Sequence, residues 1–212
     1  MMQIALDTAG KKFNRDWIFR NFSYHFQQGK SYAITGPNGS GKSTILQVLG
    51  GSMGVSTGKI EWKTERNNNQ VTIEHENIHK QVAIVAPYLE VIEEMTIKEF
   101  LHFHQTFKPF TSSVTINDII QVIGLEKAAD KQIRFYSSGM KQRVKLAQAI
   151  FADVPILLLD EPCTNLDTNG YKLYHQLIAD YGKNKIIIVS SNDINEYSFC
   201  EEQINIMDYK TA

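Results

Sequence analysis

The chain has 212 residues, of which 42% are hydrophobic and 21% charged, and its formal net charge is −1. This composition is ordinary for a folded globular protein, and the near-neutral charge argues against a nucleic-acid partner. No apolar run approaches the ~20 residues of a membrane-spanning helix, and the N-terminus lacks the layout of a secretion signal. The two cysteines, Cys163 and Cys200, form no disulfide framework, which indicates free thiols in a reducing, cytoplasmic setting.

The first third of the chain has the alternating pattern of β-strands. Two or three strands are expected before residue 36, the last of them ending at 32–35. Beyond them, the patterns predict a short helix at 45–49 and strands at 58–62, 71–73 and 82–85, with a hairpin tip at 67–69.

The middle of the chain has helical spacing instead. Thr96-Ile97-Lys98-Glu99 is a capping box before an apolar stripe, and a second helix is expected to begin at Thr115 and to stop at Gly124. We therefore expect a helical insertion over about 88–135, between two parts of a sheet-based core.

The last third alternates helices with buried strands. A helix is expected from Ser137 to a point before Pro155, and another over 168–181. The apolar runs 156–159 and 186–189 predict parallel strands that are buried on both faces. A short helix from about Ile194 and a strand at 203–207 are expected to close the chain. This alternation predicts a mostly parallel sheet with right-handed crossovers.

One stretch, Gly36-Pro37-Asn38-Gly39-Ser40-Gly41-Lys42-Ser43-Thr44, fits the pattern G-x-x-x-x-G-K-[ST] between an expected strand and an expected helix. Its glycines let successive backbone N–H groups point at phosphate oxygens, and the helix N-terminus adds a partial positive charge. Lys42 is expected to reach the β- and γ-phosphates, and the Ser43 hydroxyl to ligate Mg²⁺. The stretch predicts a nucleoside triphosphate site.

Two further groups of residues suit the same chemistry. Asp160 follows a central strand and is expected to hold Mg²⁺ beside Ser43, and Glu161 could polarise a water for in-line attack on the γ-phosphate. Ser137 and Gly139 stand at a helix N-terminus, which is a second anion site. Because one nucleotide cannot easily use two separate N-termini of one chain, this second site suggests a face-to-face dimer, although an ordinary serine cap is the simpler interpretation of it alone.

Together these residues resemble the ATP-binding subunit of ABC transporters over nearly the whole chain. Residues 36–44 look like the Walker A motif, 136–140 like the signature, 156–161 like Walker B with its catalytic glutamate, and 165–167 like the D-loop. The resemblance implies an α/β fold: one P-loop NTPase domain over 1–212 with a mostly parallel sheet, an N-terminal antiparallel β subdomain and the inserted α-helical subdomain.

The resemblance also implies the function. The chain would be an ATPase that uses ATP and Mg²⁺, forms a homodimer or heterodimer of ATPase subunits, and binds a membrane-embedded transporter subunit at the inner face of the membrane. The coupling surface would lie near 88–94. The expected ATP-binding residues are Phe13, Gly36, Asn38, Gly39, Ser40, Gly41, Lys42, Ser43, Thr44, Ser137, Gly139 and Asp167. The expected metal ligands are Ser43 and Asp160, and the expected catalytic residues are Glu161, Lys42 and Asn192.

Phe13 stands where the family stacks an aromatic ring on adenine. A core phenylalanine is the competing interpretation, and Trp17 is the alternative stacking residue.

The sequence departs from the family pattern in three places. Tyr136, Ser138 and Met140 replace the usual signature leucine, first glycine and glutamine. Pro87 or Tyr88 replaces a glutamine that touches Mg²⁺, and Asn192 or Ser191 replaces a histidine at the γ-phosphate. Because asparagine donates hydrogen bonds but does not titrate, we expect slow turnover and a pH profile without an imidazole limb.

Two other classes of protein fit the sequence less well. A non-transport ABC-type ATPase acting on DNA or ribosomes would usually carry long coiled coils or two such domains, and this chain has neither. A P-loop kinase would need an acceptor pocket, and a GTPase needs the pattern N-K-x-D, whose aspartate is missing from Asn184-Lys185-Ile186-Ile187.

Overall fold

The computed structural model describes residues 1–66 and 69–210 and contains two sheets. The antiparallel sheet has the order β2-β1-β4-β5 and consists of β1 (Gln3–Phe13), β2 (Asp16–Gln27), β4 (Thr57–Arg66) and β5 (Asn69–Ile73). The parallel sheet has the order β6-β7-β8-β3-β9 and consists of β3 (Ser31–Thr35), β6 (Val82–Val85), β7 (Ile156–Asp160), β8 (Ile186–Ser190) and β9 (Glu202–Asn205).

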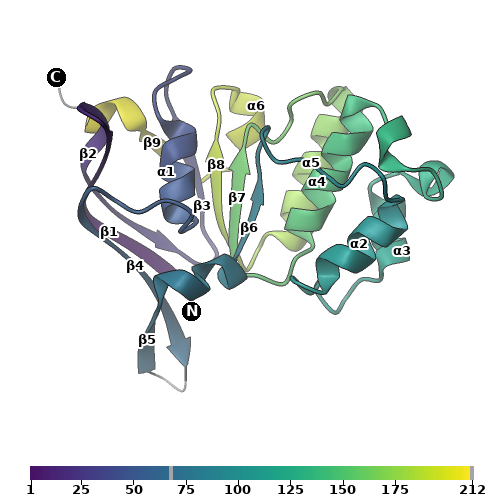
Figure 1. Cartoon of the computed structure of the whole chain (residues 1–212), viewed down its shortest axis with the longest axis horizontal. Helices are drawn as coiled ribbons and strands as arrows, with labels where there is room; N and C mark the ends of the chain where they lie inside the picture. The colour runs from purple at the N-terminus through teal and green to yellow at the C-terminus, as the bar shows by residue number, and fades with distance from the viewer. Residues whose placement is uncertain (67–68, 211–212) are drawn as a thin grey trace.

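Helices separate and cover these sheets (Figure 1). Helix α1 (Lys42–Leu49) lies between the antiparallel and parallel sheets, while α4 (Ser138–Ile150) and α5 (Thr168–Tyr181) cover the opposite face of the parallel sheet. Helices α2 (Ile97–Gln105) and α3 (Ile116–Val122) pack outside α4. The remaining helices are α6 (Ile194–Tyr197) and the 3₁₀ turns η1 (His75–Gln81), η2 (Glu126–Ala128), η3 (Ile133–Phe135) and η4 (Ile206–Tyr209). No helix within the described residues is long and apolar enough to cross a membrane.

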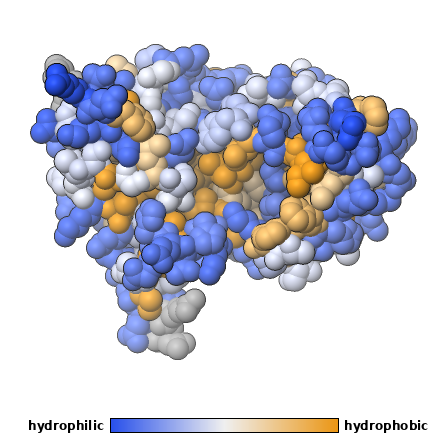
Figure 2. Space-filling view, viewed as in Figure 1, coloured by the Kyte–Doolittle hydropathy of each residue, from blue (hydrophilic) through white to orange (hydrophobic). Residues whose placement is uncertain are grey.

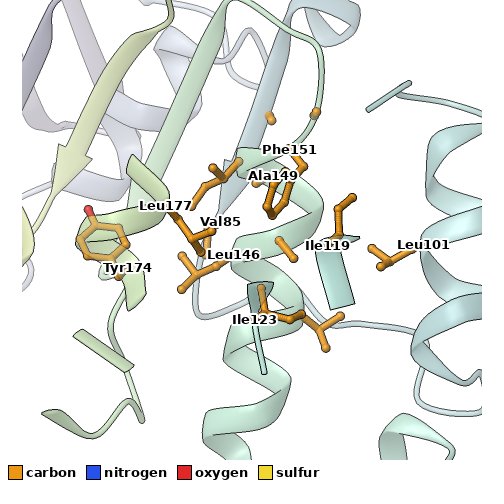
Figure 3. Close-up of a cluster of buried hydrophobic side chains, with 14 of the residues drawn as sticks. Val85, Leu101, Ile119, Ile123, Leu146, Ala149, Phe151, Tyr174 and Leu177 are labelled. Atoms are coloured by element: carbon orange, nitrogen blue, oxygen red, sulfur yellow. The ribbon is translucent and has the colours of Figure 1, made fainter. Parts of the chain in front are cut away.

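The two faces of the parallel sheet bury two different apolar clusters because its strands alternate. Leu157 and Leu159 of β7 point to the cluster shared with α4 and α5, whereas Leu158 points to the cluster under α1 and the antiparallel sheet. All five residues of β7 are buried, and so are all five of β8, as the continuous apolar runs predict. Figure 3 shows the first cluster, in which side chains of α4 and α5 meet those of α2 and α3.

Most elements form where the sequence predicts them. The expected capping box is present at Thr96, and the helix expected to begin at Thr115 starts with a capping box as well. Several boundaries were predicted wrongly: β4 continues past residue 62 to Arg66, and β5 begins at Asn69 rather than at 71. Two further differences have a clear local cause. Helix α1 begins at Lys42 rather than at residue 45, because Gly41 with φ 101° turns the loop directly into the helix. The last strand ends at Asn205 rather than at 207, because the Asn205 side chain accepts a hydrogen bond from Met207 N (3.0 Å) and starts a 3₁₀ turn. The expected hairpin tip includes residues 67 and 68, which lie outside the described residues.

One histidine of α2 faces the interior. The His104 ring stacks on Phe110 with centroids 5.5 Å apart, and its Nδ1 has no hydrogen-bond partner in the described part of the chain. Burial, with a smaller contribution from Lys108, lowers the pKa of His104 to about 4. The folded chain therefore holds this ring neutral at pH values where an unfolded histidine, with a pKa of about 6.5, takes a proton.

We predict that the free energy of unfolding falls as pH drops below about 6.5 towards 4, because only the unfolded state binds this proton. Between pH 7 and pH 5, the titration of His104 should lower the free energy of unfolding by about 1 kcal/mol, after allowance for its partial exposure. Urea unfolding at both pH values should give a smaller loss for His104→Phe than for the unsubstituted chain. His102→Gln, at an exposed position of the same helix, should leave the loss unchanged; an equal loss in all three proteins would contradict this assignment.

Candidate functional site

The loop between β3 and α1 has the backbone that phosphate binding requires. Gly36, Gly39 and Gly41 have φ values of 142°, 75° and 101°, a region that favours glycine. Lys42 is buried and its Nζ donates hydrogen bonds to Gly36 O (2.8 Å) and Pro37 O (3.3 Å), so the ammonium lies inside the curve of the loop.

The hydroxyls of the loop differ in their surroundings. Ser40 Oγ is buried and has no hydrogen-bond partner in the described part of the protein, which suits a loop that meets an outside ligand. Ser43 is exposed and Thr44 half-buried, at the N-terminus of α1. The loop therefore presents a cation, hydroxyls and a helix N-terminus together, which is a binding site for a polyphosphate.

Two isoleucines from distant parts of the chain press against this loop. A Cβ added at Gly41 would lie 2.2 Å from Ile18 Cγ2 of β2, and one at Gly36 would lie 2.7 Å from Ile206 Cγ2 of η4. Sequence reasoning missed both contacts. The alternating pattern indicates that such residues are buried, but it carries no signal of what they touch.

The loop after β8 reaches the phosphate loop. Asn192 Nδ2 donates a hydrogen bond to Asn38 Oδ1 (2.8 Å). Ser191, the other candidate for the family's histidine position, is buried, and its Oγ accepts from Asp193 N (2.9 Å). Of the two, Asn192 is therefore the side chain at the phosphate loop.

The two acids at the carboxyl end of β7, Asp160 in the strand and Glu161 directly after it, lie beside the loop that follows β8. Asp160 is 3% exposed and pairs in register with Ser190 of β8, while Glu161 N donates to Ser190 O (2.9 Å). Glu161 has φ 45°, a left-handed backbone conformation that residues other than glycine rarely adopt. The residue is exposed. A carboxylate at Asp160 and a hydroxyl at Ser43 are the oxygen ligands that Mg²⁺ prefers, and α1 packs against β7.

The N-terminus of α4 lines a separate cavity of 660 Å³. Ser137 caps the helix by accepting from Met140 N (3.3 Å), and a Cβ at Gly139 would lie 3.0 Å from Asn165 O. Asp167 caps α5 through Gly170 N (2.8 Å) and lies 3.9 Å from Arg143, which also lines the cavity. None of the described residues 36–44 lines it, so the structure does not bring the two expected anion sites together in one chain.

Three aromatic residues named by the sequence analysis, Phe13, Trp17 and Tyr88, have different surroundings. Phe13, at the end of the β1–β2 hairpin, is 45% exposed, with Lys11 Nζ 5.3 Å from its ring centroid. Two cations, Lys12 and Arg20, lie close to the Trp17 ring, whereas Phe13 has one such neighbour, so the Phe13 ring is the more accessible for stacking. Tyr88 is half exposed and its hydroxyl accepts from Gln47 Nε2 of α1 (3.3 Å), which ties the segment after β6 to the helix of the phosphate loop.

The parallel sheet, the glycine loop before α1 and the acids after β7 define a nucleotide-binding protein of the P-loop class. The family model described as "ABC transporter" matches residues 19–164, and the chain belongs to this family. An uncharacterised ABC transporter ATP-binding protein of Bacillus subtilis is 31% identical over 193 residues, which are 90% of this chain and 86% of that protein. The cytochrome c biogenesis ATP-binding export protein CcmA of Rhizobium johnstonii is 28% identical, over 90% of this chain and 88% of its own length.

Solved structures have the same fold. An ABC transporter ATP-binding protein of Pyrococcus furiosus, 19% identical, superposes with a TM-score of 0.80 over 99% of this chain and 100% of its own. A dimeric ATP-binding cassette with ADP and Pi bound, 23% identical, gives a TM-score of 0.77 over 96% of this chain and 94% of its own.

We predict that two glycines of the loop respond differently to alanine. Gly39→Ala places its Cβ in open space and carries only the strain of a positive φ, about 1 kcal/mol. Gly41→Ala adds a collision with Ile18 and should cost about 3 kcal/mol in the free energy of unfolding. Chemical denaturation measures both.

The collision has its own check. Ile18→Ala should cost less in the Gly41→Ala background than in the unsubstituted chain, because it removes the clashing methyl group. Equal losses in both backgrounds would show that Ile18 does not limit this position.

Proposed function

We propose that this chain is the ATP-binding and hydrolysing subunit of an ABC transporter, which powers transport through a separate membrane-embedded subunit by ATP-driven dimerisation. One observation carries the proposal: the candidate residues lie in two separate places on the chain. Asn192 contacts the phosphate loop, and Asp160 and Glu161 pair with Ser190 just before Asn192, whereas Ser137 and Gly139 face a different cavity.

Each chain would bind and hydrolyse its own nucleotide in the following way. Lys42 and the loop N–H groups bind the β- and γ-phosphates, and Ser43 and Asp160 hold Mg²⁺, which neutralises charge on the phosphates when bound. Glu161 accepts a hydrogen bond from the attacking water and turns its oxygen towards the γ-phosphorus. The Asn192 amide donates to the γ-phosphate instead of an imidazolium.

The partner chain would complete the site. The N-terminus of α4, with Ser137 and Gly139, offers N–H groups and a hydroxyl to the γ-phosphate held by the other subunit. The dimeric arrangement of a relative of the same fold supports this interpretation. Asp167 and Asn165 line the same cavity and would lie at the dimer interface.

The surface for the membrane subunit is proposed at 88–94. Tyr88 and Ile92 are exposed there, and Leu89 and Glu90 line a cavity of 200 Å³ between β6 and α2. Ala83, Ile84 and Ala149 line the same cavity, and Figure 2 shows apolar side chains in a hollow near the middle of the face that it views. Such a surface fits an apolar partner segment, and it would hold the chain at the inner face of the membrane.

We predict that Glu161→Gln binds ATP, does not hydrolyse it, and doubles in mass with Mg-ATP in light scattering, because the closed dimer is trapped. Adding Ser137→Arg should abolish the doubling, since the new side chain fills the surface that receives the partner's γ-phosphate. Adding Lys127→Ala, at the rim of the same cavity, should preserve it. A Glu161→Gln chain that binds Mg-ATP yet stays monomeric would count against dimerisation driven by ATP alone.

We predict that Asn192→Ala lowers kcat about tenfold or more, the value of one hydrogen bond to a charged group. Asn192→His should add a limb near pH 6.5 to the pH profile of kcat, which the unsubstituted chain lacks. Steady-state ATPase assays between pH 5.5 and 8.5 test both, and an unaltered rate in Asn192→Ala would remove this side chain from the γ-phosphate.

A further inference from the structure

One peptide group after Walker B is held from both sides by buried side chains. Gln142 Nε2 of α4 donates to Pro162 O (2.6 Å), and Cys163 N donates to Glu196 Oε1 of α6 (2.8 Å). Both atoms belong to the same peptide unit, so its plane is fixed by two helices that are far apart in the sequence. Gln142 is 6% exposed and Glu196 4% exposed. We call this arrangement, Gln142–(Pro162–Cys163)–Glu196, the peptide clamp.

The clamp begins one residue after Glu161. Glu161 holds a left-handed φ of 45°, and its carbonyl accepts from Thr164 Oγ1 (2.8 Å) and Thr164 N (3.2 Å). A strained residue persists only where its surroundings over-determine it. Rotation of the next peptide plane would change the local backbone and hence the direction of the Glu161 carboxylate.

The two helices of the clamp also carry other parts of the site. Helix α4 begins at the cap Ser137, which faces the separate cavity. Helix α6 follows Asn192, whose side chain contacts the phosphate loop. The clamp is therefore a direct physical connection between the helix that would contact the partner's nucleotide and the acid that would activate water.

We infer that Gln142 and Glu196 are positioning residues for ATP hydrolysis: by holding the Pro162–Cys163 peptide from both sides they direct the Glu161 carboxylate and tie its direction to α4 and to the loop of Asn192. This inference rests on the proposed function, because Glu161 acts on water only there. Both residues work through hydrogen bonds to the backbone and touch no reacting atom.

The chemistry of Glu196 suggests the conservative variant. Burial raises the pKa of its carboxyl group, and hydrogen bonds from Ser191 and from Cys163 N oppose this rise, while the neighbouring acids Asp193 and Glu161 add to it. Glutamine has nearly the same shape as the acid and still offers an acceptor to Cys163 N. Methionine keeps the volume but removes the acceptor, and at residue 142 it removes the donor.

The test combines kinetics with amide exchange on the full chain. Glu196→Met and Gln142→Met should each lower kcat for ATP about tenfold with KM within twofold, because binding groups are untouched. Glu196→Gln should keep kcat within about twofold. The Met/Met double variant should fall little further than either single variant, since all three release the same peptide. Exchange of the Cys163 N–H, followed by NMR, should become about tenfold faster in Glu196→Met but not in Glu196→Gln.

A matched control separates positioning from stability. Tyr174→Phe removes the hydrogen bond from Tyr174 Oη to Glu196 O (2.9 Å) and so loosens the same helix without touching the clamp. It should lower Tm while leaving kcat within about twofold. The inference is overturned if either methionine variant keeps the unsubstituted kcat, if Tyr174→Phe loses as much kcat, or if the two methionine effects multiply.

Failure of the proposed function looks different: the unsubstituted chain would then show no Glu161-dependent turnover, and exchange of the Cys163 N–H alone would decide whether the clamp holds its peptide.

Discussion

The phosphate loop has no room for a side chain at Gly36 or Gly41, and the arrangement of the rest of the site depends on this constraint. Ile18 from β2 fills the space beside Gly41, and Ile206 from η4 fills the space beside Gly36. These two residues come from opposite ends of the chain. The antiparallel sheet and the C-terminal turn thus both pack against one loop, at the point where the Lys42 ammonium lies inside its curve.

The order of the parallel sheet brings the remaining groups to that point. Strand β3 pairs with β8, and β8 pairs with β7, so the loops that follow these three strands open on the same edge. Two hydrogen bonds then join neighbouring loops, from Asn192 to Asn38 and from Glu161 N to Ser190 O. In the proposed site, the group at this position would be an amide that donates hydrogen bonds and carries no titrating charge.

Helix α4 is part of the apolar core and also lines the separate cavity. Its apolar side chains Leu146 and Ala149 lie in the cluster shared with α5 and the sheet, and its N-terminus faces the cavity lined by the D-loop residues. The segment before it is also held to residues that follow β6, because Ile133 N donates to Met95 O (2.8 Å) and Arg134 N to Glu93 O (2.9 Å). Two backbone hydrogen bonds therefore join the segment 88–95 to the residues that lead into α4.

Local pattern alone was sufficient for much of this protein. Capping boxes at Thr96 and Thr115 are local hydrogen-bond systems, so their letters predict where α2 and α3 begin. The buried runs of β7 and β8 and the glycine loop before α1 are equally local, and they led to the fold class and to the family. The sequence failed at 206–207, where an asparagine side chain starts a turn in place of a strand.

Tertiary structure alone decided which residues meet. Nothing in the sequence near Gly41 indicates Ile18, and nothing near Pro162 indicates Gln142 and Glu196, because these contacts join residues separated by 20 or more positions, 33 in the case of Cys163 and Glu196. The sequence likewise offered both Asn192 and Ser191 for one position, and only the folded chain assigns Asn192 to the phosphate loop. Local hydrogen bonding and periodicity are written along the chain, whereas close packing depends on the path that the whole chain takes.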